Sequence, residues 1–503
     1  MYLCSLMMLS RQTAYLRSLF GLLLMAGLLQ AQKIEGTLEL EWRRPQSDFF
    51  IEGCPADGGV VFIYPKATPP RILALHKYSA NWVAEWSLDL NDLDRGEEVA
   101  QLVVVDTIIW LFTQRIWNQQ LKLFAYKVTL SGRVLARAQE VLSFPLSSKR
   151  HIRVTYTPDR QWACLSFSVR RLTDSLVHFG YFVIGRDSAF GGIWTPPYPK
   201  HKLEILPPLQ PGYDGTLYAL GKVEGRDALH PTYVLFRYIP WSNLTLQLPL
   251  ETDEGYLKHP VFRVEKEKIR LAGFYSERQG KGVRGLVFAE VRLPGFFLTV
   301  TQKTPLPQDI LERYLSGRQI ERGRGVPDLY LDHLIPQQDG GVILVGEQFF
   351  MIRKITRKTT ITQSQFPNTT PIKWEKEDLE YHYYDVLIFS VDSLGALRWV
   401  RVIPKKQIGD EGTRAVLSYA LLVGPTKLYI FYRGYERGTG VELFAVSVDK
   451  QGNMSSPSPL IPDFRAYTLF FRRYTRQLTS TEGLIIYYRS RTLKYYLNRV
   501  KLE

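Results

Sequence analysis

The sequence predicts an all-β fold, a single β-propeller made of repeated four-stranded units. Three observations indicate this class. Aromatic residues make up 13% of the 503-residue chain, Gly and Pro recur along its whole length, and no long stretch shows sustained helical periodicity. Repetition explains the length better than separate domains do. The alternative, a pair of β-sandwich domains, would leave the even spacing of the units unexplained.

The clearest unit ends in Tyr384–Pro404, YDVLIFSVDSLGALRWVRVIP. Two runs rich in β-branched and aromatic residues flank the turn Asp392–Gly395, so two antiparallel strands are expected to meet at a tight hairpin. Upstream, the turn Asp339-Gly340-Gly341 leads into Val342–Phe350, and Leu329–Pro336 supplies a strand before that turn. The unit therefore has four strands.

The same pattern recurs along the chain. The units span Phe49–Leu90, Glu98–Phe144, His151–Trp194, Lys202–Leu250, Lys258–Val300, Leu329–Pro404, Thr413–Leu460 and Arg465–Leu502. The eighth has only three strands, whereas Thr37–Trp42 is a strand without a local partner. We therefore expect eight blades, with seven as the alternative. Thr37–Trp42 should close the ring by pairing beside Arg491–Leu502.

Two insertions interrupt the repeats. Residues 307–326 are expected to form a helix packed on the blades, with Asp309 as its N-cap. Residues 353–380 link the second and third strands of the sixth unit. They are expected to form a long mobile loop over one face, because other units use connections of under about ten residues.

The first 31 residues have the layout of a secretory signal peptide. Arg11 and Arg17 precede the apolar run Leu19–Leu29, and Ala31 marks the expected cleavage site. A retained membrane anchor is the alternative, but eleven apolar residues are few for a span. The sequence thus predicts a β-propeller over residues 32–503 that is secreted, periplasmic or extracellular, without a transmembrane span and monomeric.

Cysteine usage is consistent with this interpretation. Cys54 and Cys164 remain after the signal peptide and lie far apart in the repeat order. We expect two buried free thiols rather than a disulfide. Their spacing gives no support for a metal site, and no cofactor is predicted.

Part of the chain resembles a known group of proteins. The segments Gly273–Val291, Asp339–Gln348 and Tyr381–Gln407 resemble uncharacterised secreted propeller-like proteins from Bacteroidota. The resemblance is specific over about Leu257–Asn453. It implies a propeller fold and carries no activity or catalytic residues to this chain.

Motifs that carry chemistry are almost absent. The sequence has no HExxH, GxSxG, P-loop or EF-hand pattern. Gly280–Gly285 matches GxGxxG by letter, but a strand follows it instead of a helix, so it offers no helix N-terminus for a phosphate. The eight histidines are scattered singly. Glu347, flanked by apolar residues, is a weak catalytic candidate that could face the channel; hydrolysis of a glycosidic bond would need a second carboxylate.

The basic residues are unevenly distributed. The chain without its signal peptide has a net charge of +13, and the connections between second and third strands hold 21 basic and 9 acidic residues. All such connections emerge on one face of a propeller, so this face is predicted to bind an anionic partner. The proposed binding residues are Arg115, Arg170, Arg171, Arg433 and Arg491.

These observations favour a non-enzymatic binding or scaffolding propeller outside the cytoplasm. Its partner would be an anionic polysaccharide, a lipid head group or a protein. The alternative is a polysaccharide hydrolase or lyase built on a propeller, which raised carboxylate pKa values at a channel mouth would favour. Nucleic acid is suggested only by the pI near 9.5, and export argues against it.

Overall fold

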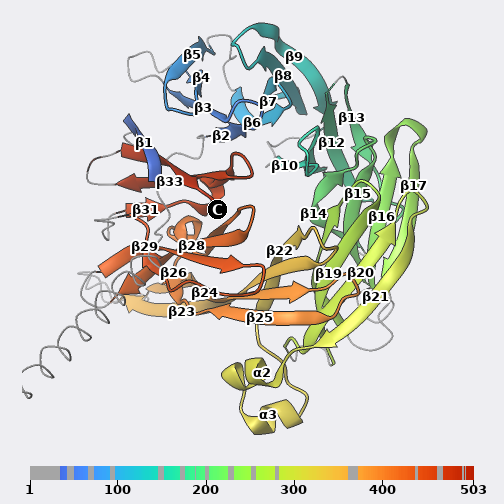
Figure 1. Cartoon of the computed structure of the whole chain (residues 1–503). Coiled ribbons are helices and arrows are strands. Elements are labelled where there is room, and N and C mark those ends of the chain that lie inside the picture. The colour runs from blue at the N-terminus through green and yellow to red at the C-terminus, as the bar shows by residue number, and fades with distance from the viewer. Residues whose placement is uncertain are drawn as a thin grey trace, which may run out of the picture.

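The described strands are arranged as blades around a ring (Figure 1). The computed structural model describes residues 34–41, 50–65, 73–90, 97–145, 152–169, 176–186, 188–198, 203–224, 232–250, 256–277, 282–360, 372–436, 440–461, 468–489, 492 and 494–503. The expected signal peptide, residues 1–31, lies outside the described residues.

Each blade is an antiparallel meander of four strands, numbered from the innermost strand outward. Blade 1 has β2 (Phe50–Cys54), β3 (Gly59–Pro65), β4 (Leu73–Tyr78) and β5 (Ala84–Asp89); blade 2 has β6 (Glu98–Val105), β7 (Ile108–Trp117), β8 (Gln120–Thr129) and β9 (Val134–Phe144). Blade 3 has β10 (Arg153–Tyr156), β11 (Trp162–Val169), β12 (His178–Gly185) and β13 (Ala189–Trp194); blade 4 has β14 (Leu203–Pro211), β15 (Leu217–Val223), β16 (Thr232–Ile239) and β17 (Leu244–Leu250).

The remaining blades follow the same order, with small additions. Blade 5 has β18 (Tyr256–Val264), β19 (Lys268–Ser276), β20 (Gly285–Arg292) and β21 (Phe297–Pro305); blade 6 has β22 (Leu329–Pro336), β23 (Val342–Thr360), β24 (Ile372–Val391), β25 (Leu397–Ile403) and the short β26 (Gln407–Gly409). Blade 7 has β27 (Tyr419–Val423), β28 (Lys427–Glu436), β29 (Gly440–Asp449) and β30 (Ser458–Pro459); blade 8 has β31 (Thr468–Phe470), β32 (Arg476–Gln477), β33 (Glu482–Arg489), β34 (Lys494–Lys501) and β1 (Ile34–Glu41). Short 3-10 turns are η1 (Pro240–Ser242), η2 (Arg414–Val416) and η3 (Arg472–Tyr474). The predicted eight-bladed propeller is thus confirmed.

The N-terminal strand closes the ring, as the sequence predicts. β1 pairs antiparallel with β34, with Leu38 opposite Leu497. Thr37 Oγ1 donates a hydrogen bond to Asn498 Oδ1 at 2.7 Å. β1 is the outermost strand of blade 8, so residues from the two ends of the chain share one sheet.

The core is divided among the contacts between neighbouring blades. Separate clusters of buried apolar residues lie between blades 1 and 2, 2 and 3, and so on around the ring. The seam between blades 8 and 1 has its own cluster, which includes Leu40, Phe62 and Leu497. Because alternate residues of each strand point to opposite faces of its sheet, every blade packs against both neighbours.

Turns that begin with Asp and contain Gly connect strands where the sequence predicts them. In the hairpin between β24 and β25, Asp392 Oδ1 accepts hydrogen bonds from the backbone amides of Leu394 and Ala396. Gly395 adopts φ 93°, and a Cβ there would lie 2.5 Å from Gln302 of blade 5. Only glycine therefore fits both the turn and the close approach of the neighbouring blade.

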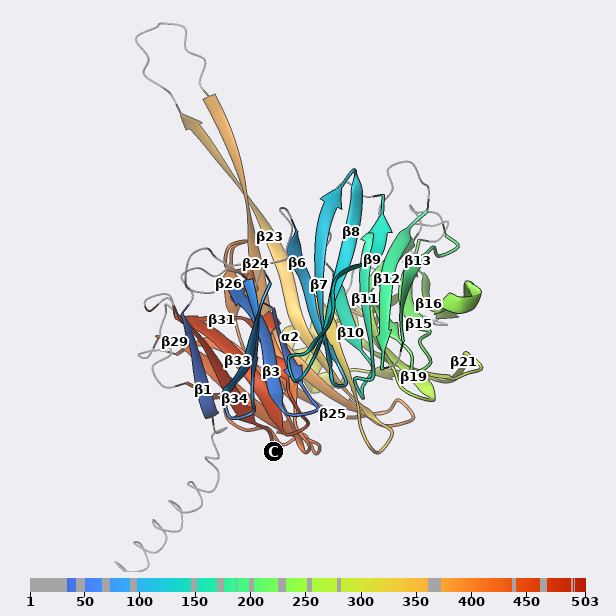
Figure 2. The ribbon, with the colours of Figure 1, turned by 90° about the horizontal axis from the view of Figure 1, so that it is seen from above.

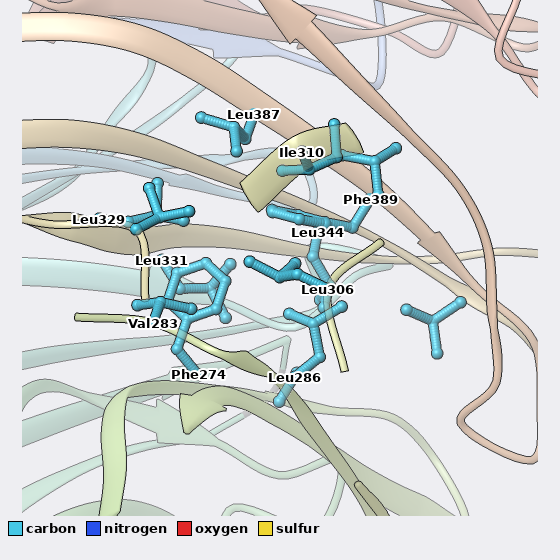
Figure 3. Packing of buried hydrophobic residues seen from close by; sticks show 14 of the residues in the cluster. Phe274, Val283, Leu286, Leu306, Ile310, Leu329, Leu331, Leu344, Leu387 and Phe389 are labelled. Carbon is cyan, nitrogen blue, oxygen red and sulfur yellow. The ribbon is translucent and has the colours of Figure 1, made fainter. Parts of the chain in front are cut away.

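The predicted helical insertion forms two short helices, α2 (Gln308–Tyr314) and α3 (Gly317–Glu321). Asp309 lies in the first turn of α2, and Pro307 takes the N-cap position that was expected for Asp309. Figure 3 shows Ile310 of α2 packed with side chains of blades 5 and 6, among them Leu344 and Phe389. The helices therefore extend the core between these two blades.

The described part of residues 353–380 forms two paired strands instead of the predicted mobile loop. β23 and β24 continue to pair from Ile352 opposite Glu380 as far as Thr360 opposite Ile372. Figure 2 shows this two-stranded ribbon projecting from the ring, on the same side as the tip of the β7–β8 hairpin. β-branched residues and cross-strand ion pairs, such as Lys354 Nζ with Glu380 Oε2 at 2.5 Å, support the strands.

Two faces of the ring follow from this meander. The side where second and third strands connect, including the ribbon, is called the hairpin face. The opposite side, where the first strand turns into the second and the third into the fourth, is called the turn face. Each innermost strand runs from the hairpin face to the turn face.

Candidate functional site

A cavity of about 580 Å³ lies at the centre of the ring. It is lined by the innermost strands of blades 3 to 6, by the turn after β10 and by Gln477 of blade 8. The turn after β10 belongs to the turn face, so the cavity extends toward that face. Its size falls within the roughly 300–1,000 Å³ usual for small-molecule sites.

Irregular pairing shapes the wall of this channel cavity. The register shifts between Leu331 and His333 in β22, which leaves Asp332 as an extra residue. Similar shifts interrupt β14 and β18. A β-bulge re-aims side chains, and both Asp332 and His333 line the channel cavity although the strand around them is apolar.

Arg160 is a cation of the channel cavity whose charge is already balanced. Its Nη1 lies 2.9 Å from Glu52 Oε1 of blade 1, and its Nη2 donates to the Gln477 carbonyl of blade 8 at 3.4 Å. Arg476 Nε lies 3.4 Å from the other Glu52 oxygen. The buried Glu52 carboxylate thus holds two arginines and ties blades 1, 3 and 8 together.

Arg263 is a second cation of the channel cavity, and its surroundings differ. It lies near the end of β18 and lines the cavity. Burial lowers the pKa of its guanidinium, while Tyr213 and Glu265 act in the opposite direction. Glu265 is ion-paired with Arg270 at 3.0 Å. Among the described residues, none forms a hydrogen bond or ion pair with the Arg263 guanidinium.

Asp332 is the acidic residue in the wall of the channel cavity, within the described part of the chain. Tyr419 Oη donates a hydrogen bond to its Oδ2 at 3.0 Å. Burial raises the pKa of Asp332 to about 6 despite Tyr419 and the nearby cation Arg472. Burial, with Arg472, lowers the pKa of the neighbouring His333 to about 4. At pH 7 Asp332 is therefore largely ionised and His333 is neutral.

Glu347, the weak catalytic candidate, lies behind this wall. Its side chain is 4% exposed and is not part of the cavity lining. Its Oε1 lies 2.5 Å from Lys405 Nζ, and Ser418 Oγ donates to Oε2 at 2.5 Å. Burial raises the pKa of Glu347 and lowers that of Lys405. This geometry is that of a buried ion pair within blade 6, which Ser418 links to the start of blade 7.

The arginines proposed for the hairpin face are not gathered into this cavity. Arg115 lies on β7, its guanidinium carbon 5.0 Å from the ring centre of Trp117. Arg433 lies on β28, where burial lowers its pKa. Neither lines the channel cavity. Arg170, Arg171 and Arg491 lie outside the described residues.

Sequence reasoning missed the residues that do converge. Asp332 and His333 interrupt the apolar strand LYLDHLIP, and this interruption was a usable signal. Arg263 had no comparable signal, because arginines at strand ends are common on surfaces. Only the ring brings β18 and β22 together around one space.

Several other expectations concern the rest of the molecule. Cys54 and Cys164 are free and buried, as predicted. Within the described ranges, no group of three or more His, Cys, Asp or Glu side chains is placed to hold a metal ion. The helices of the described part are too short or too polar to cross a membrane.

Comparison with known proteins finds similarity to solved structures only at low identity. No family model and no curated protein sequence matches this chain. Among solved structures, it is similar to the WD40 domain of SCAP from fission yeast, with 10% identity and a TM-score of 0.37 over 93% of this chain and 98% of that one. It is also similar to the β-propeller domain of the Trilobed protease from Pyrococcus furiosus, with 9% identity and a TM-score of 0.35 over 83% and 96% of the two chains.

Proposed function

We propose that the protein is a non-enzymatic binding propeller that acts outside the cytoplasm and holds a segment of an acidic polysaccharide in its channel cavity. The observation that carries this proposal is Arg263, a cation without an ionic partner among the described residues, in the wall of a cavity of about 580 Å³. Its pKa is lowered by burial, so its charge is partly removed from water and gains by meeting an anion.

A uronic-acid carboxylate suits this position. A guanidinium offers two parallel N–H donors that match the two oxygens of a carboxylate. Arg160, in contrast, is ion-paired with Glu52. It therefore helps to form the cavity wall, and its charge is already neutralised by that carboxylate. The cavity lies inside the ring, which favours a narrow polymer over the head groups of a lipid surface.

The arrangement favours binding over hydrolysis. The usual hydrolysis of a glycosidic bond requires two carboxylates at a defined separation. Asp332 has the raised pKa expected of a general acid, but Glu347 is buried behind the wall and paired with Lys405. Within the described residues, the cavity therefore presents a single carboxylate.

The test is calorimetric titration with an oligomer of galacturonic acid at low salt. Arg263→Gln should weaken binding about tenfold or more, because it removes a charge-assisted hydrogen-bonded contact. Arg398→Gln is the matched control, since Arg398 is an exposed arginine paired with Asp339, and it should bind like the parent. Equal affinity of Arg263→Gln and the parent would contradict the proposal.

The hairpin face gives a competing location for the same ligand. The variant that tests it replaces Arg115, Arg170, Arg171, Arg433 and Arg491 by Gln. If this variant loses affinity while Arg263→Gln does not, the anion binds on the hairpin face and the cavity is not the site. Loss in Arg263→Gln alone supports the cavity. Binding of anionic lipid vesicles, but not of the oligomer, would contradict the polysaccharide.

A further inference from the structure

An exposed aromatic pair marks the rim of two neighbouring blades. Trp241, in the turn between β16 and β17 of blade 4, is 65% exposed, and Phe297, at the start of β21 of blade 5, is 50% exposed. Leu244 and Leu298 beside them are 47% and 40% exposed. The third-to-fourth-strand turns that carry these residues belong to the turn face. We refer to Trp241 and Phe297 as the aromatic rim.

The outermost strands beside the aromatic rim hold little charge, and the exposed Arg292 lies opposite Phe297 on the neighbouring strand. The outermost strands β17 and β21, LTLQLPL and FLTVTQKTP, contain one charged residue, Lys303. Its ammonium lies 4.5 Å from the ring centre of Tyr275. A surface with aromatic rings, Thr and Gln side chains and the cation Arg292 fits a ligand with apolar faces, hydroxyl groups and carboxylates.

A series of interactions links Arg263 of the channel cavity to the aromatic rim. Tyr213, which together with Glu265 acts to raise the pKa of Arg263, precedes Asp214 in the first turn of blade 4. Asp214 Oδ2 lies 3.6 Å from Arg237 Nη2, and Arg237 Nη1 donates to the Pro294 carbonyl of blade 5 at 2.6 Å.

These contacts place the aromatic rim around one junction between blades 4 and 5. Trp241 follows Arg237 by four residues, and Phe297 follows Pro294 by three. Both therefore flank the Arg237–Pro294 contact. The cavity and the rim lie along the same border between blades, on the same face of the ring.

We infer that the aromatic rim is a second subsite for the polysaccharide held in the channel cavity, which stacks Trp241 and Phe297 on the apolar faces of its sugar rings. This inference rests on the proposed function. Large aromatic side chains give contact area at low conformational cost, and the C–H faces of a pyranose ring are the apolar surface that such rings contact. A chain anchored by its carboxylate at Arg263 then runs outward along the border to the rim.

Two ligand lengths separate the two subsites. Monomeric galacturonic acid reaches only the channel cavity, whereas a long oligomer reaches both. Trp241→Ala/Phe297→Ala should weaken oligomer binding about tenfold and leave monomer binding unchanged. Arg263→Gln should weaken both ligands. Leu394→Ala/Val83→Ala is the control, because it trims two apolar residues that are 70% and 62% exposed elsewhere.

Each outcome decides one point. If the double aromatic variant binds the oligomer like the parent, the aromatic rim is not a subsite, whatever Arg263→Gln does. If Arg263→Gln is unaffected while the aromatic variant loses the oligomer, the proposed function fails at the cavity and the rim binds sugar independently, which overturns the linked site. Trp241→Tyr/Phe297→Tyr keeps aromatic rings and should retain oligomer binding; loss in this variant would contradict stacking.

Discussion

Removing one partner of the buried Glu347–Lys405 pair should destabilise the fold strongly. Both side chains are almost inaccessible, at 4% and 1% exposed, and their charged atoms are 2.5 Å apart. The pKa of Glu347 is raised and that of Lys405 lowered, each chiefly by burial. Both pKa shifts indicate that the free-energy cost of desolvating the two charges exceeds the favourable energy of their ion pair. Lys405→Met leaves Glu347 buried without its cation, and we expect a loss of about 3–5 kcal/mol at pH 7.

Replacing both partners should cost much less. Lys405→Met/Glu347→Leu removes both desolvated charges and leaves Ser418 Oγ without its acceptor, for which we expect a loss of about 1–2 kcal/mol. An exposed pair gives the control: Lys354 and Glu380 are 56% and 28% exposed. Lys354→Met should cost less than about 1 kcal/mol.

The assay is urea denaturation followed by tryptophan fluorescence, at pH 7 and pH 5. A carboxyl group whose folded-state pKa is raised gains stability from protonation as the pH falls through that pKa. The loss in free energy of unfolding caused by Lys405→Met should therefore be smaller at pH 5 than at pH 7. The reasoning is refuted if Lys405→Met is as stable as the parent, or if the double variant loses as much as the single one.

Three further results are expected. Leu40→Ala, which empties a buried position at the seam of blades 8 and 1, should cost about 2–5 kcal/mol in urea denaturation, and parent-like stability would mean that β1 does not close the ring. Oligomer affinity measured by calorimetry should rise from pH 7 to pH 5, because Asp332, with its pKa raised to about 6, loses a negative charge in the wall of the cavity that holds the anion. Asp332→Asn should abolish this pH dependence, and an unchanged dependence would exclude Asp332 as its source. The thiols of Cys54 and Cys164, both buried, should react with a thiol reagent only after denaturation, so fast labelling of the folded protein would contradict their burial.

The fold could be predicted because each four-stranded unit is specified by residues close together in the sequence. Alternating apolar residues and Asp-Gly turns such as Asp339-Gly340-Gly341 specify each meander from its own residues. The closing strand followed from counting, since an orphan strand and a three-stranded blade complement each other. The ribbon was missed because its charges suggested a loop, whereas Arg353 and Lys354 pair across the strands with Glu377 and Glu380.

The candidate site could not be predicted in the same way. Arg263 and Asp332 belong to different blades, and their place in the wall of one cavity depends on where each innermost strand shifts its register. Counting basic residues in loops also cannot tell a paired cation from an unpaired one. Arg353 raises the count on the hairpin face and is ion-paired with Glu377, while Arg263 belongs to a strand that the count left out.

The pairing of β1 with β34 also means that the ring can close only late in synthesis. Among the described strands, β1 leaves the ribosome first. Its partner strand follows several hundred residues later, as the contact between Thr37 and Asn498 shows. Until that partner appears, β1 is an unpaired strand, and afterwards β34 offers an open edge until β1 arrives. Where two copies fold side by side, β1 of one fits the edge of the other equally well. Strand exchange at this seam is therefore the simplest route by which this ring would form a dimer on refolding at high concentration.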